Sequence, residues 1–169
     1  SPEIIEQIID ACKAGAGDAG NSLSIALDSA IQIVDVASGN LPVEGLGPGL
    51  AIVFEIGDAG MALLLPEATK MLPTWYAAPD ATGESKLQTL AQELATLVVP
   101  EGLEVTKYAA APIGDLRSAL QSAEPADPLA CLQLTVQGDD GDGAFHLCWP
   151  LKQPAALLAQ PHPGTVQPA

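Results

Sequence analysis

The sequence has few basic residues. It contains 6 Lys and Arg against 21 Asp and Glu, which gives a formal net charge of -15. Proteins that bind nucleic acid or anionic membranes use Lys and Arg to contact phosphate groups, so both classes of partner are disfavoured. Two interpretations of the acidic surface stay open: it keeps the protein soluble, or it binds a basic protein surface.

Metal ligands and cross-linking residues are also scarce. The chain has two histidines, His146 and His162, and three cysteines at wide spacing, Cys12, Cys131 and Cys148. No C-x-x-C pair is present, so we expect no zinc site and no other metal. An odd number of scattered cysteines predicts reduced, buried thiols in a cytoplasmic protein. No apolar run approaches the roughly 20 residues that a membrane span needs.

What the sequence does contain is enough apolar material for a sizeable core. The chain has 169 residues, of which 48% are hydrophobic. This length and composition are typical of one globular domain rather than a disordered segment. A catalytic or binding role must therefore be sought in local motifs and in their order along the chain.

A glycine-rich stretch near the start allows two interpretations. Gly15, Gly17 and Gly20 spell G-x-G-x-x-G, the dinucleotide-binding fingerprint, and Asp35 stands about where the ribose-binding acid would be. A true fingerprint follows a buried strand, whereas the apolar residues before these glycines recur at helical spacing of three and four. They are Ile4, Ile5, Ile8, Ile9 and Cys12. One long helix with glycines at close-packing positions is favoured, no cofactor is expected, and a dinucleotide-binding protein is the least favoured alternative.

The remainder of the chain indicates an internal repeat. After the first helix we expect a strand over 31–36 and a hairpin of strands over 50–56 and 61–65. The second half offers a loop over 80–83, a helix over 84–99, a strand over 103–108, a helix over 113–122, a linker over 124–128, and hairpin strands over 129–136 and 144–149. Repeated hairpins predict an α/β (α+β) fold in which long helices cover a mixed or antiparallel sheet with pseudo-twofold symmetry.

The repeat also defines the expected domain organisation. Its halves, about 1–72 and 84–151, form one domain over 1–151. Residues 152–169 are rich in Pro and Ala and are expected to form a linker or frayed tail. A further domain beyond the end of this chain is compatible with such a linker.

Residues 10–23, D-A-C-K-A-G-A-G-D-A-G-N-S-L, resemble a known helix motif. They are similar to E-I-G-N-I-G-A-G-N-A-A-T-A-L, the first helix of the CheC/CheX/FliY phosphatase superfamily and the FliM/FliY flagellar motor switch middle domains. The hairpins match as well, with an apolar strand, a Gly-Asp turn and a Leu-rich strand that ends in Pro. The resemblance spans roughly residues 3–151 and implies a CheC-like fold.

The resemblance also implies two catalytic pairs. In the phosphatases of this family, a Glu binds the conserved lysine of a response regulator, and an Asn three residues later orients the water that attacks the aspartyl phosphate. Asp10 and Lys13 stand at the first pair, and Glu93 and Thr96 occupy the place of the second. Lys13 cannot supply the amide geometry, and Thr96 has a shorter reach than Asn, so both pairs are degenerate.

We therefore expect a non-enzymatic protein-interaction module of a chemotaxis or flagellar motor switch type system. The implied partners are a CheY-like response regulator or flagellar switch proteins, and a FliN-like domain is a candidate continuation after the tail. The alternative is an aspartyl-phosphate phosphatase of a response regulator that uses Glu93 and Thr96. Trp75 and Tyr76 either cover the core or form an exposed binding anchor, because aromatic residues are enriched at binding hot spots.

Overall fold

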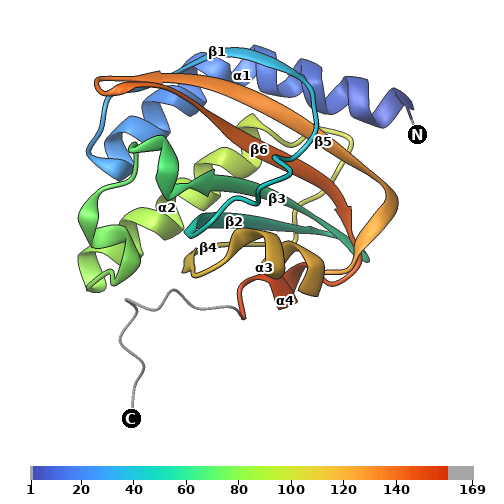
Figure 1. Ribbon diagram of the computed structural model, residues 1–169. Helices are drawn as coiled ribbons and strands as arrows, with labels where there is room; N and C mark the ends of the chain where they lie inside the picture. The colour runs from blue at the N-terminus through green and yellow to red at the C-terminus, as the bar shows by residue number, and fades with distance from the viewer. Residues whose placement is uncertain (1, 160–169) are drawn as a thin grey trace.

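The protein is a six-stranded sheet between two layers of helices, as the computed structural model shows for residues 2–159 (Figure 1). All five strand pairings are antiparallel. The elements in chain order are α1 (Pro2–Leu27), β1 (Ile31–Ser38), β2 (Gly49–Ile56), β3 (Ala59–Pro66), η1 (Glu67–Thr69), η2 (Thr74–Ala77), α2 (Ala81–Leu97), β4 (Lys107–Ile113), α3 (Leu116–Ser122), β5 (Pro125–Gly138), β6 (Gly141–Leu151) and α4 (Pro154–Leu157).

The strand order confirms the expected internal repeat. The sheet runs β1-β5-β6-β3-β2-β4. If β1, β2 and β3 are exchanged with β4, β5 and β6, this order becomes its own reverse. The two halves of the chain are therefore related by a pseudo-twofold axis that passes between β3 and β6, and each half contributes one long helix to the same face of the sheet.

The larger core lies between the sheet and the helices α1 and α2. Phe54, Leu63 and Phe145 point from three different strands into this layer and are at most 1% exposed. Their alternation with residues of the opposite face follows from the two-residue period of a strand. The periodic apolar residues of α1 pack on them, with Ile8 and Leu23 buried.

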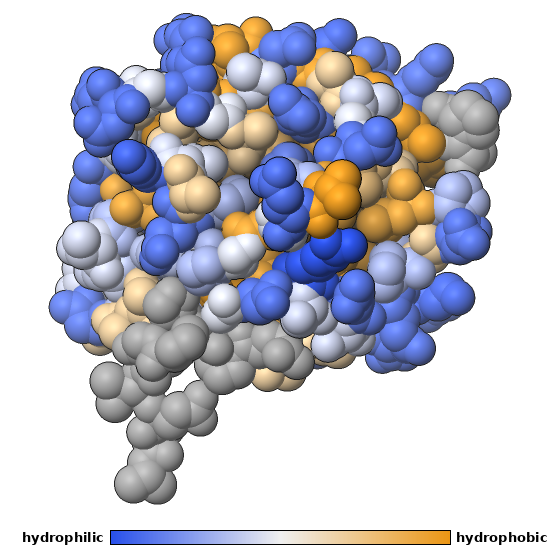
Figure 2. Space-filling model, viewed as in Figure 1, coloured by the Kyte–Doolittle hydropathy of each residue, from blue (hydrophilic) through white to orange (hydrophobic). Residues whose placement is uncertain are grey.

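A smaller core covers the opposite face of β2, β3 and β6. Leu116 and Leu120 of α3 and Leu157 of α4 pack there against Val53 and Leu64. Figure 2, which views this side of the molecule, shows apolar side chains only as small patches separated by hydrophilic ones. No helix of residues 2–159 is long and apolar enough to cross a membrane.

The first half of the chain follows the sequence pattern closely. The N-terminal segment is one helix of 26 residues, and β1, β2 and β3 contain the three expected strands. Gly57 adopts a φ of 60° in the turn between β2 and β3, a backbone conformation that glycine reaches without steric cost. These local signals agree with the packing, so the prediction is confirmed here.

The second half departs from the pattern at element boundaries. Residues 81–83 belong to α2, not to a loop, because Asp80 caps the helix by accepting a hydrogen bond of 2.8 Å from the backbone N–H of Gly83. The fourth strand is Lys107–Ile113 and begins four residues after the predicted start at 103. The reason is its pairing along β2, from Lys107 opposite Glu55 to Ile113 opposite Gly49. The helix after it accordingly starts at Leu116.

Two expected linkers also form regular structure. Residues 125–128 open β5, since Pro125 lies opposite Leu151 of β6. Residues 154–157 form α4, in which Pro154 and Leu157 are buried. The expectation of a linker or frayed tail is therefore wrong for residues 154–157, which contact the smaller core. Residues 160–169 of the expected tail lie outside the described residues.

Candidate functional site

The helices α1 and α2 lie side by side and run in opposite directions. Near one end, the Cys12 thiol approaches the Val98 carbonyl oxygen at 3.8 Å. At the other end, Lys86 of α2 forms an ion pair with Asp28, which directly follows α1. The start of each helix therefore lies beside the end of the other, which defines the antiparallel arrangement.

Several buried positions of α1 and α2 match with one shift along the chain. The shift is 71 residues, the distance from Cys12 to Gly83. The other matched buried positions are Ala19 and Leu90, Gly20 and Ala91, Leu23 and Leu94, and Leu27 and Val98. We use this shift to compare positions of the two helices and call two positions that it relates equivalent.

At one end the helices are in direct backbone contact. A Cβ atom on Gly15 would collide with the carbonyl oxygen of Leu97. Because the obstacle is backbone and not the end of a flexible side chain, only glycine fits there. We call this contact of Gly15 with Leu97 the closed end of the helix pair.

The other two glycines of the G-x-G-x-x-G stretch differ from Gly15. A Cβ atom on Gly20 would lie 3.2 Å from the Ile31 carbonyl oxygen, so Gly20 lets β1 approach α1. Gly17 is exposed and has nothing within 4 Å of its Cβ position, so the packing role expected for it is wrong. Residues 2–27 form one helix, so the strand that a dinucleotide fingerprint requires before Gly15 is not present.

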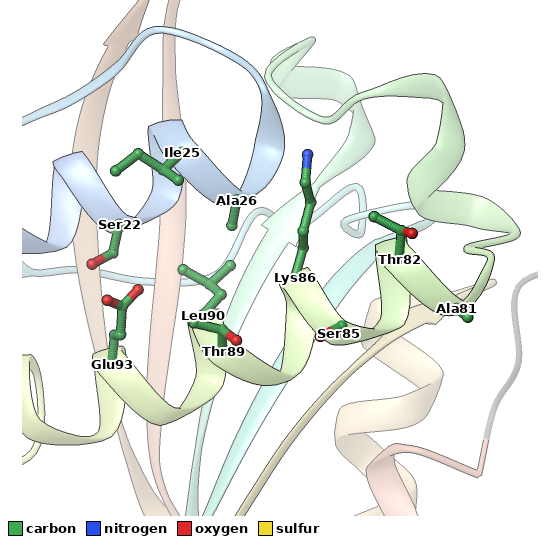
Figure 3. A pocket seen from close by; sticks show the side chains of 10 residues that line it. All are labelled: Ser22, Ile25, Ala26, Ala81, Thr82, Ser85, Lys86, Thr89, Leu90 and Glu93. Atoms are coloured by element: carbon green, nitrogen blue, oxygen red, sulfur yellow. The ribbon is translucent and has the colours of Figure 1, made fainter.

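At the other end the helices separate and leave a groove. The positions equivalent to Gly15 and Leu97 are Lys86 and Ala26, and a lysine does not permit the backbone contact that glycine allows. The groove has a volume of about 440 Å³ (Figure 3). It is lined by Ser22, Ile25 and Ala26 of α1 and by Ala81, Thr82, Ser85, Lys86, Thr89, Leu90 and Glu93 of α2. We call this region the open end.

The groove has an apolar floor and a polar rim. Ala26 and Leu90 are 7% and 0% exposed, whereas Ile25 is 77% exposed on the α1 side. Ser22 of α1 and Glu93 of α2 point toward each other across one end of the groove in Figure 3. Small side chains at Ser22, Ala26 and Ser85 leave the space open.

Lys86 is held at the edge of the groove by Asp28 and Trp75. Its Nζ atom lies 3.0 and 3.1 Å from the two carboxylate oxygens of Asp28 and 5.6 Å from the centre of the Trp75 ring. The Trp75 indole N–H donates a hydrogen bond of 3.1 Å to the same carboxylate. The hydrogen bonds from Lys86 and then from Trp75 lower the pKa of Asp28.

The candidate pair on α1 lies on the surface, outside the groove. Asp10 and Lys13 are both exposed, and the groove begins only at Ser22. The shift of 71 residues makes Ala81 and Glu84 their equivalents on α2. Neither of these two positions therefore has an acid followed three residues later by an amide, although Asp18 and Asn21, both exposed on α1, have that spacing.

The candidate pair on α2 has one member at the groove. With the shift of 71 residues, Glu93 and Thr96 compare with Ser22 and Ile25, and the correspondence of Glu93 with Asp10 that the resemblance implies stays a prediction. Thr96 donates its hydroxyl proton to the Glu93 carbonyl oxygen at 2.9 Å, which satisfies the hydroxyl within its own helix. Glu93 itself lines the groove.

The two aromatic candidates have separate roles. Tyr76 is 2% exposed and donates a hydrogen bond of 2.6 Å to a Glu67 carboxylate oxygen. Burial, followed by this contact with Glu67, raises the pKa of Tyr76. Tyr76 is thus core cover, while Trp75 is half-buried and fixes the side chains of Lys86 and Asp28 beside the groove.

Comparison with known proteins identifies the fold. A chain in the FliM–SpeE complex of H. pylori superimposes with a TM-score of 0.56 at 14% identity, over 94% of this chain and 94% of that chain. The FliM middle domain of H. pylori gives 0.53 at 12% identity, over 94% and 98%. A chain in the FliG–FliM complex gives 0.51 at 10%, over 95% and 100%.

The protein has the FliM middle-domain fold. This confirms, at the level of the fold, the expected resemblance to FliM middle domains. No family model matches the sequence, and no curated protein matches it either. With identities of 10–14%, the structural likeness defines the architecture, and the function must come from the side chains.

The groove on this FliM-type fold was missed by motif reasoning. The sequence signal for the groove is Ile25, which is apolar although it lies outside the buried face of α1. Sequence spacing alone does not show that small residues of α2 face it. Within residues 2–159, no group of three or more His, Cys, Asp or Glu side chains is placed to hold a metal ion.

Proposed function

We propose that this chain is a non-enzymatic protein-interaction module of a chemotaxis or flagellar motor switch type system, and that it binds its partner at the open end of α1 and α2. The observation that carries the proposal is Ile25, a large apolar side chain that is 77% exposed beside a groove of about 440 Å³. Exposed apolar side chains next to an apolar hollow are typical of protein-binding surfaces.

The fold supports a protein partner. The H. pylori structures that share it include FliM in complexes with FliG and with SpeE. The partner proposed for this chain is a flagellar switch protein or a CheY-like response regulator in the cytoplasm. It inserts an apolar side chain over Ala26 and Leu90 and presents basic groups to a chain of net charge -15.

The side chains on the helices argue against catalysis. Orientation of an attacking water needs an amide or a comparable group close to a carboxylate. Asp10 is followed by Lys13, and the equivalent positions of α2 carry Ala81 and Glu84. The acid and amide three residues apart that the family phosphatases use are therefore absent from the motif position of α1 and from its equivalent on α2.

Binding measurements on a matched pair of surface variants test the proposal. The intact chain is titrated with the purified switch protein and, separately, with the response regulator of the same cell. Ile25→Lys is expected to raise the dissociation constant by about 30-fold, which corresponds to a loss of about 2 kcal/mol of binding free energy for a hot-spot residue. Val43→Lys is the control, because Val43 is 89% exposed and does not line the groove. Equal affinities of the two variants for every partner would contradict the assignment of the groove.

A second assay addresses the phosphatase alternative. The decay of the phosphorylated response regulator is followed with and without the chain. We expect the same decay rate in both samples. Faster decay that disappears with Glu93→Ala would replace the binding proposal with an enzymatic one.

A further inference from the structure

Cys131 and Cys148 face each other across the β5–β6 hairpin. They are direct cross-strand partners in the ladder, far from the α1–α2 groove. Both belong to the smaller core on the opposite face of the sheet, where Cys148 is buried and Cys131 packs against it. All three cysteines of the chain carry free thiols in this structure.

The register places the two cysteines at a closely spaced position. The backbone N–H of Gly39 donates to the Cys131 carbonyl oxygen at 3.0 Å, so the hydrogen-bonding groups of Cys131 point toward β1 and away from β6. Cys131 and Cys148 are thus a non-hydrogen-bonded pair of the β5–β6 ladder. Cα atoms of such pairs are about 4.5 Å apart, which lies inside the range that a disulfide spans.

The two thiols differ in access to solvent. Cys148 is 0% exposed, whereas Cys131 is only half-buried. The sequence-based prediction of buried thiols is therefore wrong for Cys131. A hydrogen bond from Cys148 lowers the pKa of the Cys131 thiol, and the same contact together with burial raises the pKa of Cys148. Cys131 is therefore suited to attack a reagent from solvent, and Cys148 is placed to react only with Cys131.

Cys12 provides an internal contrast. It is 2% exposed, and burial raises the pKa of its thiol to about 12. No cysteine lies opposite it, since it packs against the Val98 carbonyl oxygen in the α1–α2 layer. The geometry of the hairpin, not the mere presence of thiols, distinguishes Cys131 and Cys148.

We propose that Cys131 and Cys148 form a dithiol site that reacts with small disulfides of the glutathione type. The Cys131 thiolate attacks one sulfur of the small disulfide, which forms a mixed disulfide and releases one thiolate. The Cys148 sulfur then attacks the Cys131 sulfur, forms the Cys131–Cys148 bond and releases the second thiolate. The two cysteine protons are transferred to the released thiolates, so the small disulfide is reduced to two thiols while the dithiol is oxidised.

The oxidised site would leave the groove intact. The new bond joins neighbouring strands at positions that are already paired, on the face of the sheet opposite α1 and α2. The proposal is independent of the proposed binding function, because none of the groove residues takes part.

The test uses the folded full chain incubated with oxidised glutathione, followed by mass spectrometry of the intact protein and of its peptides under non-reducing conditions. The wild type is expected to lose two hydrogens and to give a Cys131–Cys148 linked peptide. Cys148→Ser should instead accumulate a glutathione adduct on Cys131, and Cys131→Ser should react at least tenfold more slowly. Cys12→Ser is the matched control and should behave as the wild type.

Each outcome bears on the assignment. A stable glutathione adduct in the wild type would show that Cys148 does not act as the second thiol and would overturn the proposal. Reaction of Cys131 at the rate of Cys12 in the folded protein would overturn it as well. Because the comparison is made among thiols of one chain, a loss of fold in a single variant does not affect the wild-type result.

Discussion

The closed and open ends of the α1–α2 pair are built from equivalent positions, yet they differ in packing. At the closed end Gly15 lies against the Leu97 backbone, with no room for a Cβ atom. At the open end the equivalent residues are Lys86 and Ala26, and a groove of about 440 Å³ separates the helices. The glycine that permits backbone contact at the closed end is replaced by a lysine at the open end, where small side chains leave the groove.

The comparison shows where a symmetric fold becomes asymmetric. The strands preserve the pseudo-twofold relation in their order, because every strand must satisfy its backbone hydrogen bonds with defined neighbours. The helices have no such requirement toward each other, so the size of facing side chains sets their separation. The asymmetric surface of this chain therefore arises between the helices and not in the sheet.

The largest expected effect is at the closed end. Gly15→Ala should lower the free energy of unfolding by about 2 kcal/mol, because overpacking against the Leu97 backbone outweighs the better helix propensity of alanine. Chemical denaturation of the two proteins measures the difference. Gly17→Ala is the control on the same helix: Gly17 has open space around it, and alanine there should stabilise by up to about 1 kcal/mol. A gain in stability for both variants would contradict the tight contact between Gly15 and the Leu97 backbone.

A smaller effect of opposite sign is expected at the open end. Ser85→Leu places an apolar side chain in the groove beside Ile25 and Ala26, and partial burial should stabilise the fold by about 1 kcal/mol. Ser85→Ala reports the gain in helix propensity without filling the groove, so the difference between the two variants isolates packing. Ser85→Leu should also abolish partner binding, because it fills the groove. Equal stability of the leucine and alanine variants would mean that the groove does not accept an apolar group.

The smallest expected effect concerns the charges at the open end. Lys86→Met retains the side-chain stem and removes the ion pair with Asp28. The Lys86 side chain is 37% exposed and the Asp28 side chain 52% exposed, so the loss of stability is slight. Since Lys86 lowers the pKa of Asp28 in the fold, its contribution is present above the ordinary value of 3.8 and is lost as the pH falls through the lowered pKa. Unfolding measured from about pH 5 to about pH 3 should therefore be steeper in pH for the wild type than for Lys86→Met. Lys13→Met, at an exposed lysine of α1, should retain the wild-type slope.

The sequence predicted the elements that carry strong local signals. The 3.6-residue period of the first helix, the turn at Gly57 and the two hairpins were sufficient to predict α1, β2, β3, β5 and β6. The position of β4 was not predictable in this way, because Ala109, Ala110 and Ala111 have no distinct strand pattern. Their conformation follows from pairing with β2, which is a long-range contact.

The candidate site was predicted only in part. The motif on α1 indicated the correct fold, and Glu93 does line the groove. The family resemblance paired Glu93 with Asp10, whereas the matched buried positions pair Glu93 with Ser22. The residues that form the groove, Ile25 and Lys86 among them, lie on two helices and come together only through packing.

The sequence by itself determined the repeat of helix, strand and hairpin, because the periods of apolar residues and the turn residues are local properties of the chain. Only the tertiary structure decided what the glycine-rich helix does. Gly15 lies against the Leu97 backbone, Gly20 makes room for β1, and Gly17 has open space at its Cβ position. The physical reason is that the same residue type has a different role according to which backbone lies opposite it, and residues about 80 positions away in the chain supply that backbone at Gly15.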